Sequence, residues 1–80
     1  MDINRIAEYM VTKGAEETTE NNYIFYVDEL AEKFNVTIEE ILQAKAEIME
    51  RIEEFEDVVS CVDFIDNDSF QLYFWFDSVE

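Results

Sequence analysis

Carboxylates are the most abundant ionisable groups of this sequence, which contains 21 Asp and Glu residues and five Lys and Arg residues. Glu47, Glu50 and Glu54 follow one another at i, i+3 and i+7. On a helix this spacing places neighbouring carboxylates about 5–6 Å apart along one side. The repeat is comparable to that of phosphates along a nucleic-acid strand, where duplex DNA carries about one charge per 1.7 Å of axis. The spacing therefore favours a protein surface that imitates a nucleic acid.

Further carboxylates extend this array. A helical projection at about 100° per residue from Thr37 onward places a polar face opposite the apolar stripe, made of Glu39, Glu40 at its edge, Gln43, Glu47, Glu50, Glu53 and Glu54. Two more clusters lie elsewhere in the chain, namely Glu16, Glu17 and Glu20, and Asp63, Asp66 and Asp68. The alternative is an ordinary solvated helix face, since Glu is a good helix former. Such faces usually interleave Lys with Glu, which favours a functional array here.

Catalysis is not expected. The chain has no His, the commonest general base and metal ligand. The serines Ser60, Ser69 and Ser78 have no base to activate them, and Cys61 has no electropositive neighbour to lower its pKa. A single glycine cannot build a glycine-rich phosphate loop. We therefore expect a protein that is not an enzyme and needs no cofactor.

Metal binding is not expected either. Asp63, Asp66, Asn67 and Asp68 supply oxygen ligands, but a twelve-residue calcium loop needs a Gly at its sixth position and a closing Glu, and neither is in register. Cys61 is the only cysteine, which excludes an intramolecular disulfide and a cysteine-based metal cage. Because it lies in an apolar run, Cys61 is predicted to be a buried, inert thiol.

Composition predicts one folded domain over residues 1–80, because 49% of the residues are hydrophobic and 15% aromatic. The formal net charge of −16 excludes direct binding to DNA, RNA or an anionic membrane, since those partners require Lys and Arg. The sequence shows no signal peptide, and its longest apolar run, Leu72 to Phe76, is far shorter than a membrane span. A reducing cytoplasm is the expected location.

Periodicity predicts the elements of the first half of the chain. Apolar residues at helical spacing predict a helix over Asp2–Lys13, with Asp2 as its cap and Gly14 at its end. The polar stretch Ala15–Asn22 predicts an exposed loop. The strand predicted at Tyr23–Val27 is followed by a short helix that Asp28 caps and that closes at Asn35 in the left-handed conformation.

The second half is predicted to contain one long helix and a hairpin. Thr37 and Glu40 form a capping box, and a helix of about 18 residues follows with an inner stripe made of Ile38, Ile41, Leu42, Ile48, Met49, Ile52 and Phe55. The period then changes to 2, which predicts strands at Val58–Ile65 and Phe70–Phe76 joined by a turn over Asp66–Ser69. The predicted fold class is α+β, with about three helices, a C-terminal β-hairpin and one short additional strand.

This order of elements, and the segment LAEKFNVTIEEI from Leu30 to Ile41, resemble a winged-helix domain, in which a helix-turn-helix is followed by a hairpin wing. The resemblance implies that the helix from Thr37 occupies the position that enters the major groove in DNA-binding members. This helix presents carboxylates where those members present Arg and Lys, so DNA recognition does not carry over.

In size and charge the chain resembles the small DNA-mimic proteins of phages, among them anti-CRISPR and anti-restriction proteins. The resemblance implies an inhibitor that occupies the basic nucleic-acid-binding surface of a protein partner, in the host bacterial cytoplasm if a phage encodes it. The residues expected to bind that partner are Glu39, Glu40, Gln43, Glu47, Glu50, Glu54, Asp63, Asp66 and Asp68.

An interaction module or subunit is the alternative function. Tyr73 and Trp75, with Val59, Cys61 and Ile65 across the hairpin, would form an aromatic patch on the outer face of the sheet. The first helix or the strand at Tyr23–Val27 could cover this patch. If it is uncovered, it predicts a docking site or a homodimer. Salt distinguishes the two functions, because ionic contacts weaken with ionic strength and apolar contacts do not.

Overall fold

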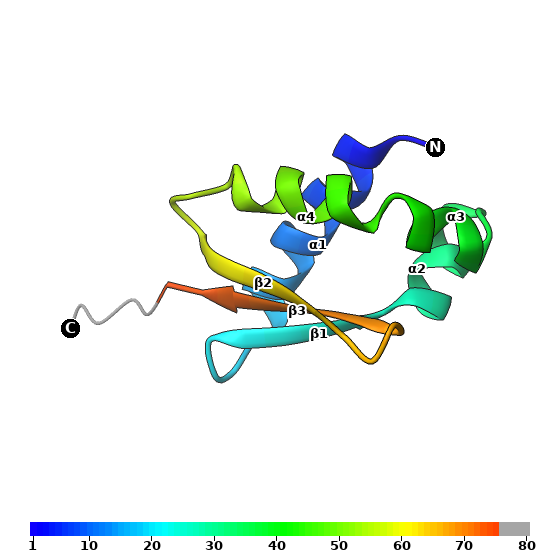
Figure 1. Ribbon diagram of the computed structural model, residues 1–80. Helices are drawn as coiled ribbons and strands as arrows, with labels where there is room; N and C mark the ends of the chain where they lie inside the picture. Colours follow the sequence, from blue (N-terminus) through cyan, green and yellow to red (C-terminus); the bar gives the residue numbers. More distant parts are fainter. Residues whose placement is uncertain (76–80) are drawn as a thin grey trace.

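A three-stranded antiparallel sheet forms one layer of the computed structural model, which describes residues 1–75. The elements follow in the order α1 (Ile3–Glu17), β1 (Asn22–Tyr26), α2 (Val27–Phe34), α3 (Ile38–Gln43), α4 (Lys45–Glu53), β2 (Val59–Ile65) and β3 (Ser69–Phe74). Of the four helices in the described part of the chain, α1 and α4 lie on one side of the sheet, and α2 and α3 lie at one end of it (Figure 1). The α+β class is confirmed, while the winged-helix resemblance stays a prediction.

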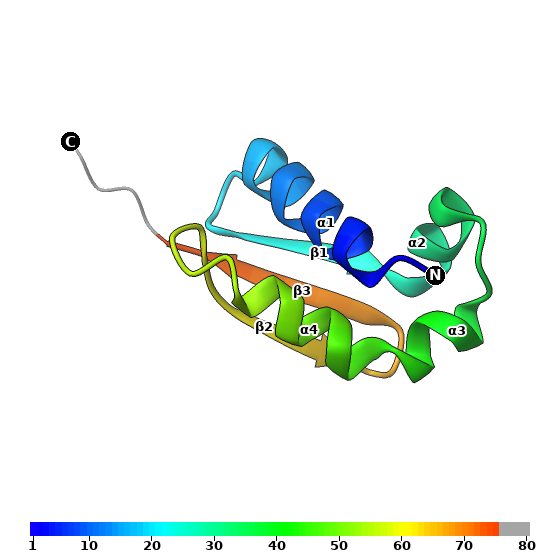
Figure 2. The same ribbon diagram turned by 90° about the horizontal axis from the view of Figure 1, so that it is seen from above.

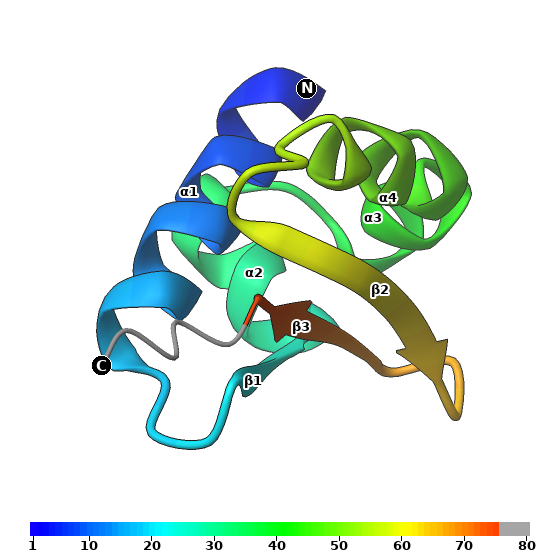
Figure 3. The ribbon, with the colours of Figure 1, turned by 90° about the vertical axis from the view of Figure 1, so that its left-hand side faces the viewer.

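The central strand is β3, since the strand order is β1-β3-β2. Phe70 lies opposite Phe25 of β1 and Phe64 of β2, and Leu72 lies opposite Val62. The predicted alternation in β3 is confirmed, because Phe70, Leu72 and Phe74 are all buried. They belong to the inner face of the sheet, which the helices cover (Figure 3).

The core fills the space between α1, α4 and the inner sheet face. Ile6 and Met10 of α1 and Ile48 and Ile52 of α4 are at most 1% exposed. Burial of each such side chain contributes about 1.5–3 kcal/mol of transfer free energy. The buried hydrophobic residues are Ile6, Ala7, Met10, Val11, Phe25, Val27, Leu30, Ala31, Ile41, Ala44, Ile48, Ile52, Val59, Val62, Phe70, Leu72 and Phe74.

Helix α1 does not end at Gly14, as the sequence predicted, but continues to Glu17. Asp2 does cap its start, accepting the Arg5 N–H at 3.2 Å. Gly14 is buried inside the helix, where an added Cβ would lie 2.6 Å from Cζ of Phe74 and 3.4 Å from Cε2 of Phe25. The glycine therefore permits a close approach between α1 and the sheet.

The connection from α2 to α3 follows the predicted capping chemistry at most positions. Asn35 adopts the left-handed conformation with φ of 56°, which Asn tolerates at a helix end. In the capping box, Thr37 Oγ1 accepts the Glu40 N–H at 3.0 Å and Glu40 Oε1 accepts the Thr37 N–H at 2.9 Å. Asp28 was expected to cap α2, but the cap is Tyr26 and Asp28 lies in the first turn.

The predicted long helix is broken into α3 and α4 at Ala44, where φ is −99° and ψ is 6°. The two axes point in different directions (Figure 2). Helix α3 packs against α2, whereas α4 packs against α1 and β2, and one straight helix cannot serve both sets of neighbours. Two residues of the predicted inner stripe are exposed, namely Ile38 at the start of α3, by 49%, and Phe55 beyond the end of α4, by 36%.

The β2–β3 hairpin turns through Asp66 and Asn67, whose φ values are 53° and 60°. Two consecutive positive φ angles match the twist of a tight hairpin. Ser69, predicted to belong to the turn, is the first residue of β3. The predicted last residue of that strand, Phe76, lies outside the described residues.

Substitution of Gly14 tests the contact between α1 and β3. Alanine favours an exposed helix interior by about 1 kcal/mol over glycine, but overpacking a core costs about 1–3 kcal/mol. Because the added Cβ meets the Phe74 ring, we expect Gly14→Ala to lower the free energy of unfolding in urea by about 1–2 kcal/mol. The loss should shrink in a Phe74→Leu background, and Thr12→Ala serves as an exposed control on α1. A more stable Gly14→Ala protein would contradict this packing.

Candidate functional site

The residues predicted to bind a partner are all exposed: Glu39, Glu40, Gln43, Glu47, Glu50, Glu54, Asp63, Asp66 and Asp68. They occupy three regions. Helices α3 and α4, with the α4 C-cap Glu54, carry the residues from Glu39 to Glu54, which we call the acidic face. Asp66 and Asp68 lie in the β2–β3 turn, and Asp63 lies on β2.

The break at Ala44 divides the acidic face into two parts. Glu47, Glu50 and Glu54 keep the predicted helical spacing on α4 and its cap. Glu39 and Glu40 project from α3, whose axis differs (Figure 2). Glu40 also has a structural role, because its carboxylate accepts the Thr37 N–H. The regular part of the array is therefore the α4 series.

Both basic residues within the acidic face are already engaged. The Nζ of Lys45 lies 4.8 Å from the centroid of the Phe64 ring and 3.5 Å from Oδ1 of Asn67. This contact joins the start of α4 to the β2–β3 turn, and so brings the turn carrying Asp66 and Asp68 up to the acidic face. The Lys45 ammonium thus lies over the ring of Phe64, which packs against the core.

Arg51 contacts both α1 and its own helix. Its Nε donates to Oδ1 of Asn4 at 2.8 Å, which ties α4 to α1. Its Nη1 lies 3.9 Å from Oε1 of Glu50 and 3.7 Å from Oε2 of Glu54. In the described part of the chain, Glu47 and Glu39 take part in no ion pair within 4.0 Å. Positive charge on this face is thus confined to its edges.

The cluster of Glu16, Glu17 and Glu20 lies apart from the acidic face, at the end of α1 and in the loop that follows. Glu17 forms an ion pair with Lys13 at 3.5 Å. The Glu17 carboxylate, helped by Tyr9, raises the pKa of the Lys13 ammonium above its usual value. Lys13 balances one of these three carboxylates, and the cluster does not extend the array.

The second candidate surface is the outer face of the sheet, which no helix covers in the described part of the chain (Figures 1 and 3). Strand register places eight accessible residues on it, which we call the open sheet face: Asn22, Ile24, Tyr26, Cys61, Asp63, Ile65, Gln71 and Tyr73. Ile24 and Tyr26 are 39% and 46% exposed. Helix α1 lies on the opposite face and β1 pairs edge to edge with β3, so neither covers Tyr73.

The composition of this face differs from the predicted aromatic patch. Val59 is 3% exposed and belongs to the core. Cys61, predicted to be buried, is exposed. A bulge between Val59 and Cys61 explains both positions, since it shifts the alternation of β2 by one residue. Ile24 and Tyr26 were missed, although their alternation with Tyr23 and Phe25 placed them on one face of a strand.

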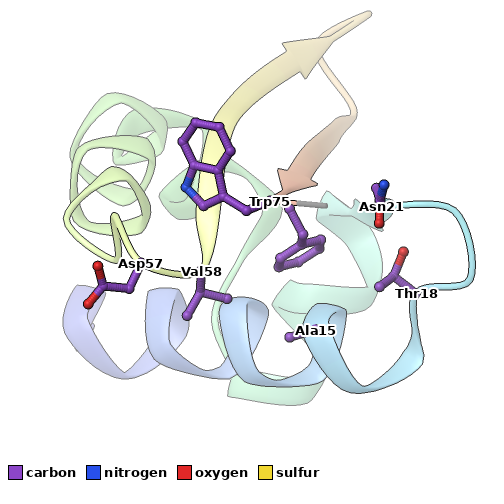
Figure 4. Close-up of a pocket in the computed structure, with 7 residues that line it drawn as sticks. Ala15, Thr18, Asn21, Asp57, Val58 and Trp75 are labelled. Carbon is purple, nitrogen blue, oxygen red and sulfur yellow. The ribbon is translucent and has the colours of Figure 1, made fainter. Parts of the chain in front are cut away.

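Trp75 lies just beyond β3, and its indole N–H donates to the Glu56 carbonyl at 2.7 Å. It lines a shallow cleft (Figure 4) together with Ala15, Thr18, Asn21, Asp57, Val58 and Phe74. Thr18 Oγ1 donates to the Asn22 carbonyl at 2.7 Å. The two hydrogen bonds are internal, and the cleft presents neither a nucleophile–base pair nor a basic side chain. We assign no catalytic chemistry to it.

Metal and membrane sites have no support in the described residues. No group of three or more His, Cys, Asp or Glu side chains is arranged there to hold a metal ion. Among the helices described between residues 1 and 75, none is long and apolar enough to cross a membrane. The two candidate surfaces are therefore the acidic face and the open sheet face.

No protein-family model, curated protein or solved structure matches this chain. We accordingly infer its function from the chemistry of the two surfaces.

Salt should stabilise the fold, because its carboxylates are exposed and largely without basic partners. Raising NaCl from about 10 mM to about 0.5 M shortens the Debye length from about 30 Å to about 4 Å. We expect the free energy of unfolding in urea to rise by about 1 kcal/mol or more. A Glu47→Gln, Glu50→Gln variant should gain less. Stability that is unchanged or falls with salt would show that self-repulsion does not limit this fold.

Proposed function

We propose that the chain is a protein-binding inhibitor that imitates nucleic acid and occupies the basic nucleic-acid-binding surface of another protein. The observation that carries this proposal is the excess of negative charge on the acidic face and the adjoining turn, where Arg51 forms ion pairs with Glu50 and Glu54 only. Between Glu39 and Asp68 the sequence places 11 of its 21 acidic residues, with Lys45 and Arg51 as the only basic ones. Both of these basic side chains have internal partners.

The α4 carboxylates match a phosphate array in spacing and in chemistry. At a rise of about 1.5 Å per residue, Glu47, Glu50 and Glu54 are separated by about 4.5 and 6 Å along the helix axis. Phosphates of one DNA strand recur about every 3.4 Å along the duplex axis and wind around it. A carboxylate, like a phosphate, accepts charge-assisted hydrogen bonds from Arg and Lys. A basic channel can therefore receive this helix in place of a strand.

The scaffold supports the array by holding α4 firmly. Ile48 and Ile52 are fully buried beneath it, and the Arg51–Asn4 hydrogen bond joins it to α1. A helix that is already ordered loses less conformational entropy on binding than a flexible acidic tail. Long-range attraction would also speed its encounter with a positive surface, and bound nucleic acid would be displaced by competition.

The concrete targets that we propose are effectors of CRISPR or restriction systems, which hold nucleic acid in basic channels. Small size and high negative charge support this choice by resemblance to phage DNA mimics. The order of helices and hairpin supports a winged-helix-like relation in which the usual basic recognition helix is replaced by an acidic one. The proposed site of action is the bacterial cytoplasm.

A second candidate function is an interaction module that docks through the open sheet face. The observation that favours it is the exposure of Ile24 and Tyr26 beside Tyr73, on a face that no helix between residues 1 and 75 covers. Binding of this kind would persist in high salt, whereas binding through the acidic face would not.

Charge reversal on α4 tests the leading proposal. Wild-type protein, Glu47→Lys, Glu50→Lys protein and a Glu8→Lys, Glu16→Lys control should be used to recover partners from bacterial lysate, with elution in a salt gradient. Glu8 and Glu16 are exposed on the outer side of α1, so the control makes the same change in net charge elsewhere. We expect the α4 variant to bind a recovered nucleic-acid-binding protein at least about tenfold more weakly, or about 1.4 kcal/mol, while the control retains most of its affinity.

Competition for the recovered protein completes the test. Wild-type chain should release labelled DNA or RNA from it, and release should weaken as salt rises. If both variants lose binding equally, only net charge matters and the acidic face is not a specific site. If the partner stays bound in high salt and tolerates the α4 variant, the module function replaces the inhibitor.

A further inference from the structure

The start of α2, the start of α3 and the β2–β3 turn lie together at one end of the sheet (Figure 1). A cleft between them has a volume of about 210 Å³. Pockets that hold small molecules are larger, at about 300–1,000 Å³, so this cleft suits one side chain of a partner better than a cofactor. Three segments that are distant in the sequence line it: Tyr26, Val27, Asp28, Ile38, Asn67 and Asp68.

Hydrogen bonds fix the walls of this cleft. The Val27 N–H, where β1 passes into α2, donates to the Asp68 carbonyl at 2.8 Å and so joins α2 to the turn. The contact between Lys45 Nζ and Asn67 Oδ1 at 3.5 Å joins the turn to α4. The capping box at the start of α3 positions Ile38. The cleft is thus part of the folded frame, and little conformational entropy is lost when a ligand enters it.

Two large apolar side chains are exposed at this cleft. Tyr26, at the end of β1, is 46% exposed, and Ile38, at the start of α3, is 49% exposed. Neither belongs to the core of the described residues. Aromatic and aliphatic side chains of this kind stabilise a complex when a partner covers them, and tyrosine is prominent among the residues that carry binding energy. The cleft therefore offers an apolar contact as well as charge.

Negative charge dominates the same cleft. Asp28 and Asp68 are both exposed, and in the described part of the chain neither forms an ion pair within 4.0 Å. Lys45 adds one positive charge beside Asn67. The starts of α2 and α3 contribute about half a positive charge each, but each of these helices carries two acidic residues in its first turn. The cleft therefore attracts a cation, and through Asp68 it continues the surface proposed to bind a basic protein.

We propose that this cleft receives an arginine side chain of the basic partner. The guanidinium group pairs with Asp28 and Asp68 and stacks on Tyr26, while the methylene groups of the arginine pack on Ile38. Guanidinium is planar, weakly hydrated and able to stack on an aromatic face, whereas the ammonium of lysine is a strongly hydrated point charge. The identity of the partner rests on the proposed function, and the preference for arginine rests on the cleft.

Amide NMR titrations of the full chain with two peptides of equal charge, acetyl-Gly-Arg-Gly-amide and acetyl-Gly-Lys-Gly-amide, test the proposal. A concentration of about 0.15 M NaCl screens the general attraction of cations to the chain. The arginine peptide should shift the signals of Tyr26, Asp28, Ile38 and Asp68 until they saturate, with an affinity at least about threefold above that of the lysine peptide. Equal affinities, or shifts that follow α4 instead of the cleft, would overturn the proposal.

Matched variants separate the cleft from net charge. Asp28→Asn, Asp68→Asn protein should lose the preference for arginine. Glu8→Gln, Glu16→Gln protein makes the same change in net charge on α1 and should keep the preference within about twofold. If circular dichroism shows that the Asp28, Asp68 variant does not fold, Tyr26→Leu replaces it, because leucine keeps an apolar side chain without the ring. A variant of the cleft that still prefers arginine as wild type does would contradict the assignment.

Failure of the cleft and failure of the inhibitor function are distinguishable. The peptide titrations use no partner from the lysate, so an arginine preference that survives while Glu47→Lys, Glu50→Lys protein retains every partner would remove the inhibitor function alone. Partner binding that depends on α4, together with equal affinities for the two peptides, would remove the arginine cleft alone.

Discussion

One apolar layer holds together a chain that its own charge pushes apart. The layer lies between the inner face of the sheet and the helices α1 and α4, and its largest members, such as Phe70, Met10 and Ile48, are fully enclosed. In the described residues, every carboxylate lies outside this layer and Ser69 is the only buried polar residue. The carboxylates therefore repel one another through solvent, which screens them. The apolar layer has to outweigh only the repulsion that remains after screening.

This arrangement explains why the acidic face and the open sheet face differ in charge. Helices on one side of the sheet bury one stripe each and turn their other side outward, so the acidic face is the outer side of α3 and α4. In the described residues no helix covers the second side of the sheet, where Asp63 is the single carboxylate among the accessible strand residues. The acidic face and the open sheet face consequently lie on opposite sides of one thin structure.

Local chemistry was predictable wherever a few neighbouring residues decide it. The Thr37–Glu40 capping box, the left-handed Asn35 and the alternation of β3 depend on spacing within a single element. Gly14 and Ala44 could not be interpreted in this way. Gly14 faces Phe74 from a distant part of the sequence, and the break at Ala44 arises because α3 and α4 pack against different neighbours.

In the candidate surfaces, too, only the features that neighbouring residues decide could be predicted. The exposure of the α4 carboxylates follows from helical period, so it could be predicted, but the separate axis of Glu39 and Glu40 could not. The open sheet face depends on two features that sequence alone does not reveal. One is the pairing of β1 with β3 rather than with β2, which is nearer to β1 in the sequence. The other is the bulge that turns Cys61 outward.

The position of β3 between β1 and β2 has a consequence for synthesis of the protein. Asn22–Tyr26 pairs with residues about fifty positions later, from Ser69 to Tyr73. Neither edge strand has its hydrogen-bonding neighbour until that segment has left the ribosome. Growing chains therefore carry the acidic helices before they have a sheet to hold them, and folding has to wait until translation has passed Phe74.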